Sequence, residues 1–171
     1  MIISERKGSC LPDSRKKELS AYRMEGARET IEVAEDCCNG KHYRDAINRS
    51  YYAAFYAVKA VLALDERDFK RHKDVIAYFN QNYVASEILP KDIGRKIARL
   101  QQRREKSDYD DFYIASKEEA EEQIGNAKSI IAAIQDYLVR KEEKKHLPVL
   151  KIPYTLSYIV QVFLYKHSYN K

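Results

Sequence analysis

The segment SYYAAFYAVKAVLAL, residues 50–64, constrains the fold more than any other part of the chain. If it is helical, it is apolar or aromatic on nearly every side, and such a helix must be buried on more than one face. Residues 42–64 are therefore predicted to form the central helix of a bundle. Only five Gly and four Pro occur in 171 residues, which favours long helices over a turn-rich sheet.

Further helices are predicted where apolar residues recur at steps of three and four. They cover residues 15–39, 72–84, 91–106 and 116–144. Pro90 suits a helix start, and Ser116 with Glu119 matches a capping box. The expected buried stripes are Leu19, Tyr22, Ala27, Ile31 and Val33 or Ala34 in the first helix, and Ala120, Ile124, Ala127, Ile131, Ile134 and Leu138 in the last. The predicted fold class is all-α, an antiparallel up-and-down bundle of about five helices.

The two ends of the chain differ from the helical part. Residues 1–14 are polar and aperiodic and are expected to be a flexible tail, whereas residues 15–145 should form the bundle. Residues 146–171 are rich in β-branched and aromatic residues. A strand pair, an extended arm and an accessory piece all remain open for this irregular C-terminal tail.

Several features favour a cytoplasmic protein that does not enter a membrane. The first residues, MIISERKGSC, lack the apolar run of a secretory signal, and two prolines and a lysine break the apolar stretch at 147–165. A disulfide between the adjacent Cys37 and Cys38 would be strained. Free thiols in a reducing compartment are therefore expected.

Some common kinds of site are absent from the sequence. The four histidines are scattered, and no His or Cys pair has the spacing of a zinc site. There is no Walker A loop, no GxGxxG motif after a strand and no G-x-S-x-G elbow. Neither a metal nor a cofactor is expected, and the formal charge of +5 would assist binding to an anionic partner.

Polar side chains interrupt the central helix between residues 46 and 57. Arg49, Tyr52 and Tyr56 are spaced for one helix face, and Ser50 adds a hydroxyl. Tyrosines in a helical core usually pack their rings and bond their hydroxyls locally, which is the plain alternative here. A buried guanidinium requires an anion or several acceptors, so Arg49 favours phosphate binding by this face.

A second polar segment, RREKSDYDDF, spans residues 103–112 at the end of the fourth predicted helix. Arg104 could grip a phosphate as a bidentate fork, with Arg103 beside it. The alternative is an ion pair between Arg104 and Asp108, four residues on, that closes the helix.

Three segments in order, NRSYYAAFYAVKAVL, RHKDVIAYF and RREKSDYDDF, resemble the HEPN family (higher eukaryotes and prokaryotes nucleotide-binding domain) over about residues 15–140. The similarity is to small stand-alone prokaryotic members. It implies an antiparallel helical bundle, usually a homodimer, in which an Arg and a nearby His cleave RNA without a metal. Arg104 matches that arginine. Tyr109 stands where ribonuclease members carry histidine, and a phenol of pKa about 10 is a poorer acid or base at neutral pH than an imidazole of about 6.5.

His72 could replace the missing histidine if the helix that it begins lies beside the motif. Otherwise it is a capping or packing residue. In the catalytic reading, a ribose 2′-hydroxyl attacks the adjacent phosphate and His72 moves the proton, while Arg104 and Arg49 hold the phosphate charge. Asp108 and Tyr109 complete the predicted catalytic set.

The resemblance also implies partners, because such proteins are often encoded beside a minimal nucleotidyltransferase and form a toxin and antitoxin pair with it. In some, the transferase adds AMP to a tyrosine near the motif, and Tyr109 is the candidate by location. Three functions stay open: a ribonuclease toxin, a non-catalytic subunit that binds nucleotide or docks the transferase, and a purely structural role for the polar residues. We expect a HEPN protein of a toxin–antitoxin-like system that binds RNA or nucleotide phosphate.

Overall fold

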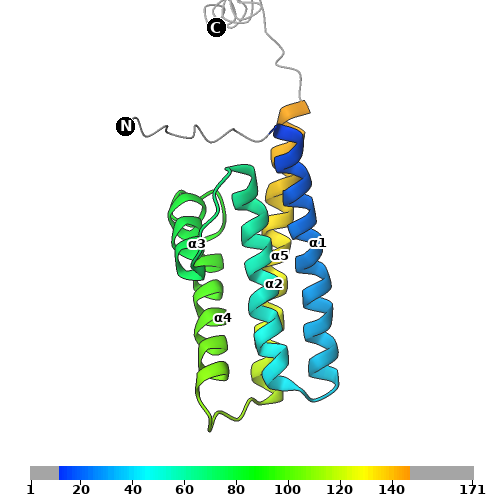
Figure 1. Ribbon diagram of the computed structural model, residues 1–171, viewed down its shortest axis with the longest axis vertical. Helices are drawn as coiled ribbons and strands as arrows, with labels where there is room; N and C mark the ends of the chain where they lie inside the picture. The colour runs from blue at the N-terminus through cyan, green and yellow to red at the C-terminus, as the bar shows by residue number, and fades with distance from the viewer. Residues whose placement is uncertain (1–11, 147–171) are drawn as a thin grey trace, which may run out of the picture. The chain divides into compact units, whose positions relative to one another are not determined.

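The computed structural model describes residues 12–146, and this part of the chain is helical with no strand. Four long helices run alternately in opposite directions, and a short one precedes the third of them (Figure 1). The elements are α1 (Asp13–Asn39), α2 (Tyr43–Leu64), α3 (His72–Phe79), the π-helical segment η1 (Asn80–Val84), α4 (Lys91–Tyr109) and α5 (Lys117–His146). The predicted all-α, antiparallel bundle is confirmed. The predictions for residues 1–11 and 147–171 lie outside the described residues, and the domain limits stay predictions.

Helix α2 is the central element, as its sequence predicts. Large buried side chains recur along it at steps of three and four, and alanines fill most of the other buried positions between them. The alanines allow α1 to pack closely along α2, and the two helices lie side by side in Figure 1. The large buried side chains of this stripe are Ile47, Tyr51, Phe55, Val58 and Leu62.

The buried face of α1 includes the predicted Ala27, Ile31 and Ala34, but the prediction for Tyr22 is wrong. Tyr22 is 77% exposed and Val33 is 45% exposed, whereas Ala34 is fully buried. The observed stripe keeps a regular helical repeat, but serine, alanine and cysteine at several of its positions make it a weak signal, so Tyr22 was included although it lies outside the stripe. Its members are Ser20, Met24, Ala27, Ile31, Ala34 and Cys38. In α5, Ile130 is fully buried where Ile131 was expected, and Ile131 and Leu138 are half-buried.

Helix α3 continues into η1, where the backbone widens by one residue. The Ala85 N–H donates to the Asn80 carbonyl at 2.8 Å, an i to i−5 bond. Helix α4 approaches this segment closely at Gly94, because a Cβ there would lie 3.2 Å from Asn80 Oδ1 and 3.3 Å from Val84 Cγ1. The glycine therefore lets α4 pack tightly against the end of the α3–η1 unit.

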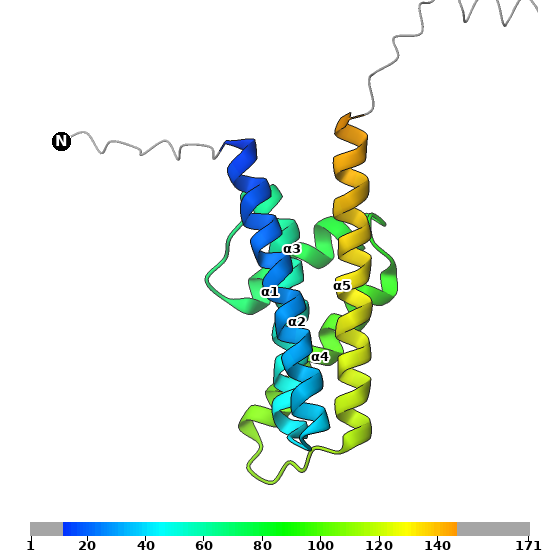
Figure 2. The same cartoon turned by 90° about the vertical axis from the view of Figure 1, so that its right-hand side faces the viewer.

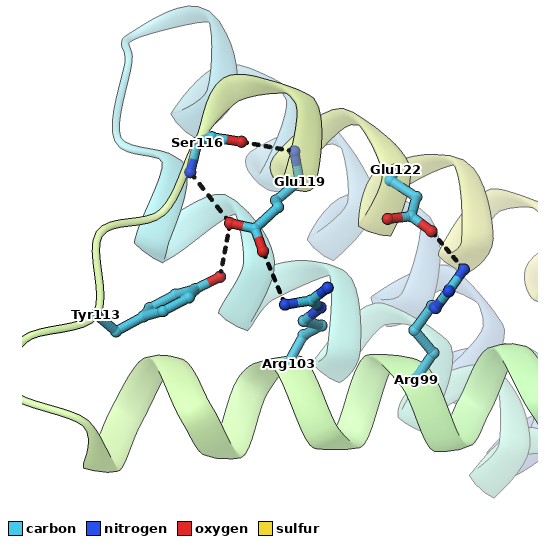
Figure 3. A network of polar contacts seen from close by, with 6 residues as sticks. All are labelled: Arg99, Arg103, Tyr113, Ser116, Glu119 and Glu122. Atoms are coloured by element: carbon cyan, nitrogen blue, oxygen red, sulfur yellow. Dashed lines mark hydrogen bonds and ion pairs between the residues drawn. The ribbon is translucent and has the colours of Figure 1, made fainter.

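The start of α5 is fixed by the predicted capping box, which is confirmed. The Glu119 N–H donates to Ser116 Oγ at 3.1 Å, and the Ser116 N–H donates to Glu119 Oε2 at 3.3 Å (Figure 3). Tyr113 donates its hydroxyl to the same carboxylate, and Arg103 Nη1 lies 2.8 Å from Glu119 Oε1. One side chain thus caps α5 and also ties it to α4.

Glu119→Ala is expected to lower the free energy of unfolding by about 1–3 kcal/mol, because it removes a helix cap and leaves partly buried partners without an acceptor. Urea unfolding followed by circular dichroism measures this. Glu122→Ala is the matched control, since its pair with Arg99 joins the same two helices but is exposed (Figure 3). That change should cost less than about 1 kcal/mol. Equal losses in the two variants would contradict a capping role for Glu119.

Two further expectations can be compared with the structure. Cys37 and Cys38 are free thiols, as predicted. Among the helices of residues 12–146, none combines the length and the apolar character needed to cross a membrane.

Candidate functional site

Arg104 lies at the centre of a group of side chains from α2, α3 and α4, which we call the Arg104 cluster. Helix α2 supplies a polar and aromatic face, α3 supplies its first residue, and α4 supplies residues from its last two turns. The members are Asn48, Tyr51, Tyr52, Phe55, His72, Arg104, Asp108 and Tyr109.

The Arg104 guanidinium is held by phenols and a carboxylate. Its Nη2 donates to the Tyr52 hydroxyl at 3.2 Å, and its Nε lies 2.9 Å from Asp108 Oδ2, although the N–H is not aligned for a hydrogen bond. Its Cζ lies 5.7–5.9 Å from the ring centroids of Tyr51, Tyr52 and Tyr109, within cation–π range. Burial works to lower the pKa of Arg104, but bonding to Tyr109 and Tyr52 outweighs it and raises the pKa. The guanidinium therefore stays charged.

Asp108 is fixed from two sides. Asn48 Nδ2 donates to both carboxylate oxygens, at 3.0 and 3.3 Å, and Arg104 lies on the other side. The i,i+4 ion pair that the sequence offered as one reading is thus present, and α4 extends to Tyr109, three residues beyond the predicted end. The pair leaves 20% of the Arg104 side chain and 26% of the Asp108 side chain exposed.

His72 reaches the cluster from the start of α3. Its ring stacks on Phe55 with centroids 4.2 Å apart, and its Nδ1 lies 3.1 Å from the Tyr51 hydroxyl. The ring also meets the Tyr52 ring edge-on at 5.9 Å. Burial, with the nearby positive charge of Arg104 and Lys59, lowers the pKa of His72. The structure therefore brings His72 beside the α4 motif, and its role in chemistry stays a prediction.

Two predicted residues of α2 lie outside the cluster or at its edge. Arg49 is exposed and forms no hydrogen bond or ion pair within residues 12–146, so the premise that its guanidinium is buried is wrong. The reason is its position on the outer side of α2, facing solvent. Tyr56 is 39% exposed, with its ring 6.4 Å from that of Tyr52, and so lies at the margin of the cluster.

Two other predicted residues have structural partners. Ser50 is fully buried and donates its hydroxyl to the Ala46 carbonyl at 2.7 Å, so it faces the core and not a ligand. Arg103 turns away from the cluster toward α5 and pairs with Glu119 (Figure 3). Of the predicted binding residues, only Tyr52 lies fully within the cluster, beside the predicted catalytic residues.

Three members of the cluster were not chosen from the sequence as site residues: Asn48, Tyr51 and Phe55. They share one face of α2 with Tyr52, because positions 48, 51, 52 and 55 follow the helical repeat. That spacing is a signal, but it becomes decisive only when the face of α2 that meets α3 and α4 is known.

Exposed apolar side chains follow the cluster in the connection between α4 and α5. Phe112 is 94% exposed and Ile114 is 89% exposed, next to Tyr109 at 77%. Large apolar side chains that gather on a surface mark interaction sites more often than isolated ones do. This connection lies at the end of the bundle opposite the start of α1, as the side view shows (Figure 2).

Comparison with known proteins identifies one family and several relatives. The sequence pattern of the HEPN domain family matches residues 20–137. A UPF0332 protein of Thermotoga maritima is 29% identical over 120 residues, which are 70% of this chain and 91% of the relative. A Methanocaldococcus jannaschii protein named "putative toxin" is 30% identical over 126 residues, 74% of this chain and 85% of the relative.

Solved structures show the same fold. An archaeal HEPN homologue superposes with a TM-score of 0.56 at 21% identity, covering 68% of this chain and 95% of that protein. A HEPN domain protein of Thermotoga maritima superposes with a TM-score of 0.53, also at 21% identity, covering 70% of this chain and 98% of that one.

Proposed function

We propose, since the chain belongs to the HEPN domain family, that it is the HEPN member of a toxin–antitoxin-type pair and binds the phosphate of an RNA or nucleotide at the Arg104 cluster. The observation that carries this proposal is the charged Arg104 guanidinium set among Tyr52, Tyr109 and His72. A toxin is also what the names of two Methanocaldococcus jannaschii relatives suggest.

The chemistry of the cluster suits a phosphate carried by a nucleotide. A guanidinium presents donors in a planar fork that matches phosphate oxygens. Tyr109, which is 77% exposed, lies over the same guanidinium and offers a ring on which a base can stack. A phosphate oxygen can take the place of the Tyr109 hydroxyl while that ring remains against the base.

A second candidate function is metal-independent cleavage of the RNA, and the position of His72 favours it. Cleavage requires a group that accepts the proton of a ribose 2′-hydroxyl as its oxygen attacks the adjacent phosphate, while Arg104 stabilises the added negative charge. Tyr109 occupies the position where ribonuclease members carry histidine. His72, which belongs to the same cluster as Arg104, is therefore the candidate proton acceptor.

The proposal includes partners in the cytoplasm: a second copy of the chain and a nucleotidyltransferase. Support comes from Phe112 and Ile114, which leave apolar surface uncovered next to the proposed site. A partner bound there could reach Tyr109, the tyrosine that we propose as the acceptor for nucleotidyl transfer.

Controlled expression in a bacterial host tests the function. Wild type and the control Arg99→Ala, a change at an exposed arginine of the same helix, are expected to arrest growth. Arg104→Ala should not, at equal soluble protein and equal helicity. Arrest by Arg104→Ala would contradict this site, and growth with the wild type would contradict the toxin role.

The same cultures separate the two candidate functions. Intact cellular RNA during arrest favours binding without cleavage, whereas RNA fragments that disappear in His72→Ala favour a ribonuclease. Co-expression with a nucleotidyltransferase encoded beside this chain tests the partner, since the two proteins should elute as one complex in size-exclusion chromatography.

A further inference from the structure

We infer that Tyr51 holds His72 in the tautomer whose proton is on Nε2, so that His72 serves the site as a neutral hydrogen-bond donor to a phosphate oxygen and not as a general base. The inference rests on the proposed phosphate binding at Arg104, and it names the role of His72 in the Arg104 cluster. Tyr51 then acts as a positioning residue. Its side chain is 3% exposed, and its hydroxyl lies 3.1 Å from His72 Nδ1.

The hydroxyl of Tyr51 is the donor in this bond. Burial is the main cause that raises the pKa of Tyr51 to about 12, so the phenol keeps its proton at neutral pH. Within residues 12–146, His72 Nδ1 is the only hydrogen-bond partner of this hydroxyl. If Nδ1 instead carried the ring proton and donated it, the phenolic proton of a buried tyrosine would lack an acceptor, which is unfavourable. Nδ1 therefore accepts, and the single proton of the neutral ring is on Nε2.

The ring is fixed in this orientation by its neighbours. Phe55 stacks on its face at 4.2 Å, and Tyr52 meets it edge-on at 5.9 Å. Partial burial of the ring, and then the positive charges of Arg104 and Lys59, lower the pKa of His72 and so favour the neutral imidazole. Nε2 has no hydrogen-bond partner in the described part of the chain, and the residue as a whole is exposed. The N–H of Nε2 is thus available to an arriving ligand.

The tautomer of His72 determines whether the ring can donate a hydrogen bond to a ligand or accept a proton from it. A neutral imidazole with its proton on Nε2 has no lone pair there to take a proton from a ribose hydroxyl. The His72 ring and the Arg104 guanidinium lie 5.9 Å and 5.7 Å from the centroid of the Tyr52 ring, so together they offer donors to a group with several negatively charged oxygens, as a phosphate ester has. Between the candidate functions, this arrangement favours binding of the phosphate over cleavage of the RNA.

Two-bond ¹H–¹⁵N correlation spectra of the full chain at neutral pH test the tautomer directly. The wild type is expected to show His72 with Nε2 protonated and Nδ1 unprotonated. Tyr51→Phe removes only the hydroxyl and should give a mixture of tautomers. A wild-type His72 protonated on Nδ1, or already a mixture, would overturn the inference, and this readout needs no variant to fold. It is also independent of any ligand, so it separates failure of this inference from failure of the proposed function.

Titration with AMP tests the donor role. His72→Gln keeps an N–H donor at a similar reach and is expected to bind within about threefold of wild type, whereas His72→Leu should bind about tenfold more weakly. Equal loss in the two variants, or no loss in His72→Leu, would overturn the donor role. If the wild type does not bind AMP or RNA, the proposed function fails, and the spectra still decide the tautomer.

Discussion

Replacing Arg104 by alanine is expected to weaken binding of AMP and of a short single-stranded RNA by about 10- to 100-fold. The change removes charged hydrogen bonds to phosphate that are worth about 1.5–3 kcal/mol, and each 1.4 kcal/mol is about tenfold in the dissociation constant. Arg104→Lys should fall between wild type and alanine, because it keeps the charge and loses the planar fork. Isothermal titration calorimetry measures AMP, and fluorescence anisotropy measures the labelled RNA.

Arg99→Ala is the control for this prediction. Arg99 lies on the same helix, and its side chain is 58% exposed beside Glu122, so the change removes the same charge from α4 without touching the cluster. Its affinities should stay within about twofold of wild type, since a single distant surface charge contributes little. Equal weakening by the two substitutions would indicate general electrostatic attraction and would contradict a defined phosphate site at Arg104.

Phe79→Ala is expected to lower the free energy of unfolding by about 3–5 kcal/mol, the cost of removing a large buried ring and leaving a cavity. Phe79 is fully buried and stacks on Tyr83 with ring centroids 5.5 Å apart. It anchors α3, an eight-residue helix whose first residue is His72. The affinity for AMP should therefore fall together with stability. Urea unfolding measures the first effect, and calorimetry at low temperature measures the second.

Phe112→Ala removes the same ring from a side chain that is 94% exposed. It should change the free energy of unfolding by no more than about 0.5 kcal/mol. If Phe79→Ala proved as mild as this control, α3 would not depend on its buried side chains, and the position of His72 would need another explanation.

The fold could be predicted from the sequence largely because its signals are local. Apolar residues on nearly every side of α2 predicted its burial, and Ser116 with Glu119 predicted a capping box. Both signals depend on residues within a few positions of one another. In α1 the prediction was wrong for Tyr22, which is exposed, because the small residues of the buried stripe give a weak signal and the neighbouring helix decides which face is covered.

In the candidate site too, contacts within one helix could be predicted from the sequence, whereas contacts between helices could not. The Arg104–Asp108 pair lies within one helix and follows from its spacing. The bond from Tyr51 to His72 joins two helices across a loop, and its formation depends on how α3 packs against α2, which periodicity alone does not give. Arg49 was chosen on the premise that its guanidinium is buried and needs an anion, but it occupies an exposed position of α2.

The carboxylate that Asn48 fastens beside Arg104 means that the empty site already contains its own counter-ion. A phosphate that binds Arg104, as we propose, must compete with this internal anion as well as with the Tyr109 hydroxyl, and few small ions are released to solution when it binds. Affinity should thus depend less on ionic strength than it does for proteins that bind nucleic acid through bare basic patches. If the site binds phosphate as we propose, chloride and sulfate should gain little from such an exchange, and molecules that bring a base and a sugar along with their phosphate should bind more tightly.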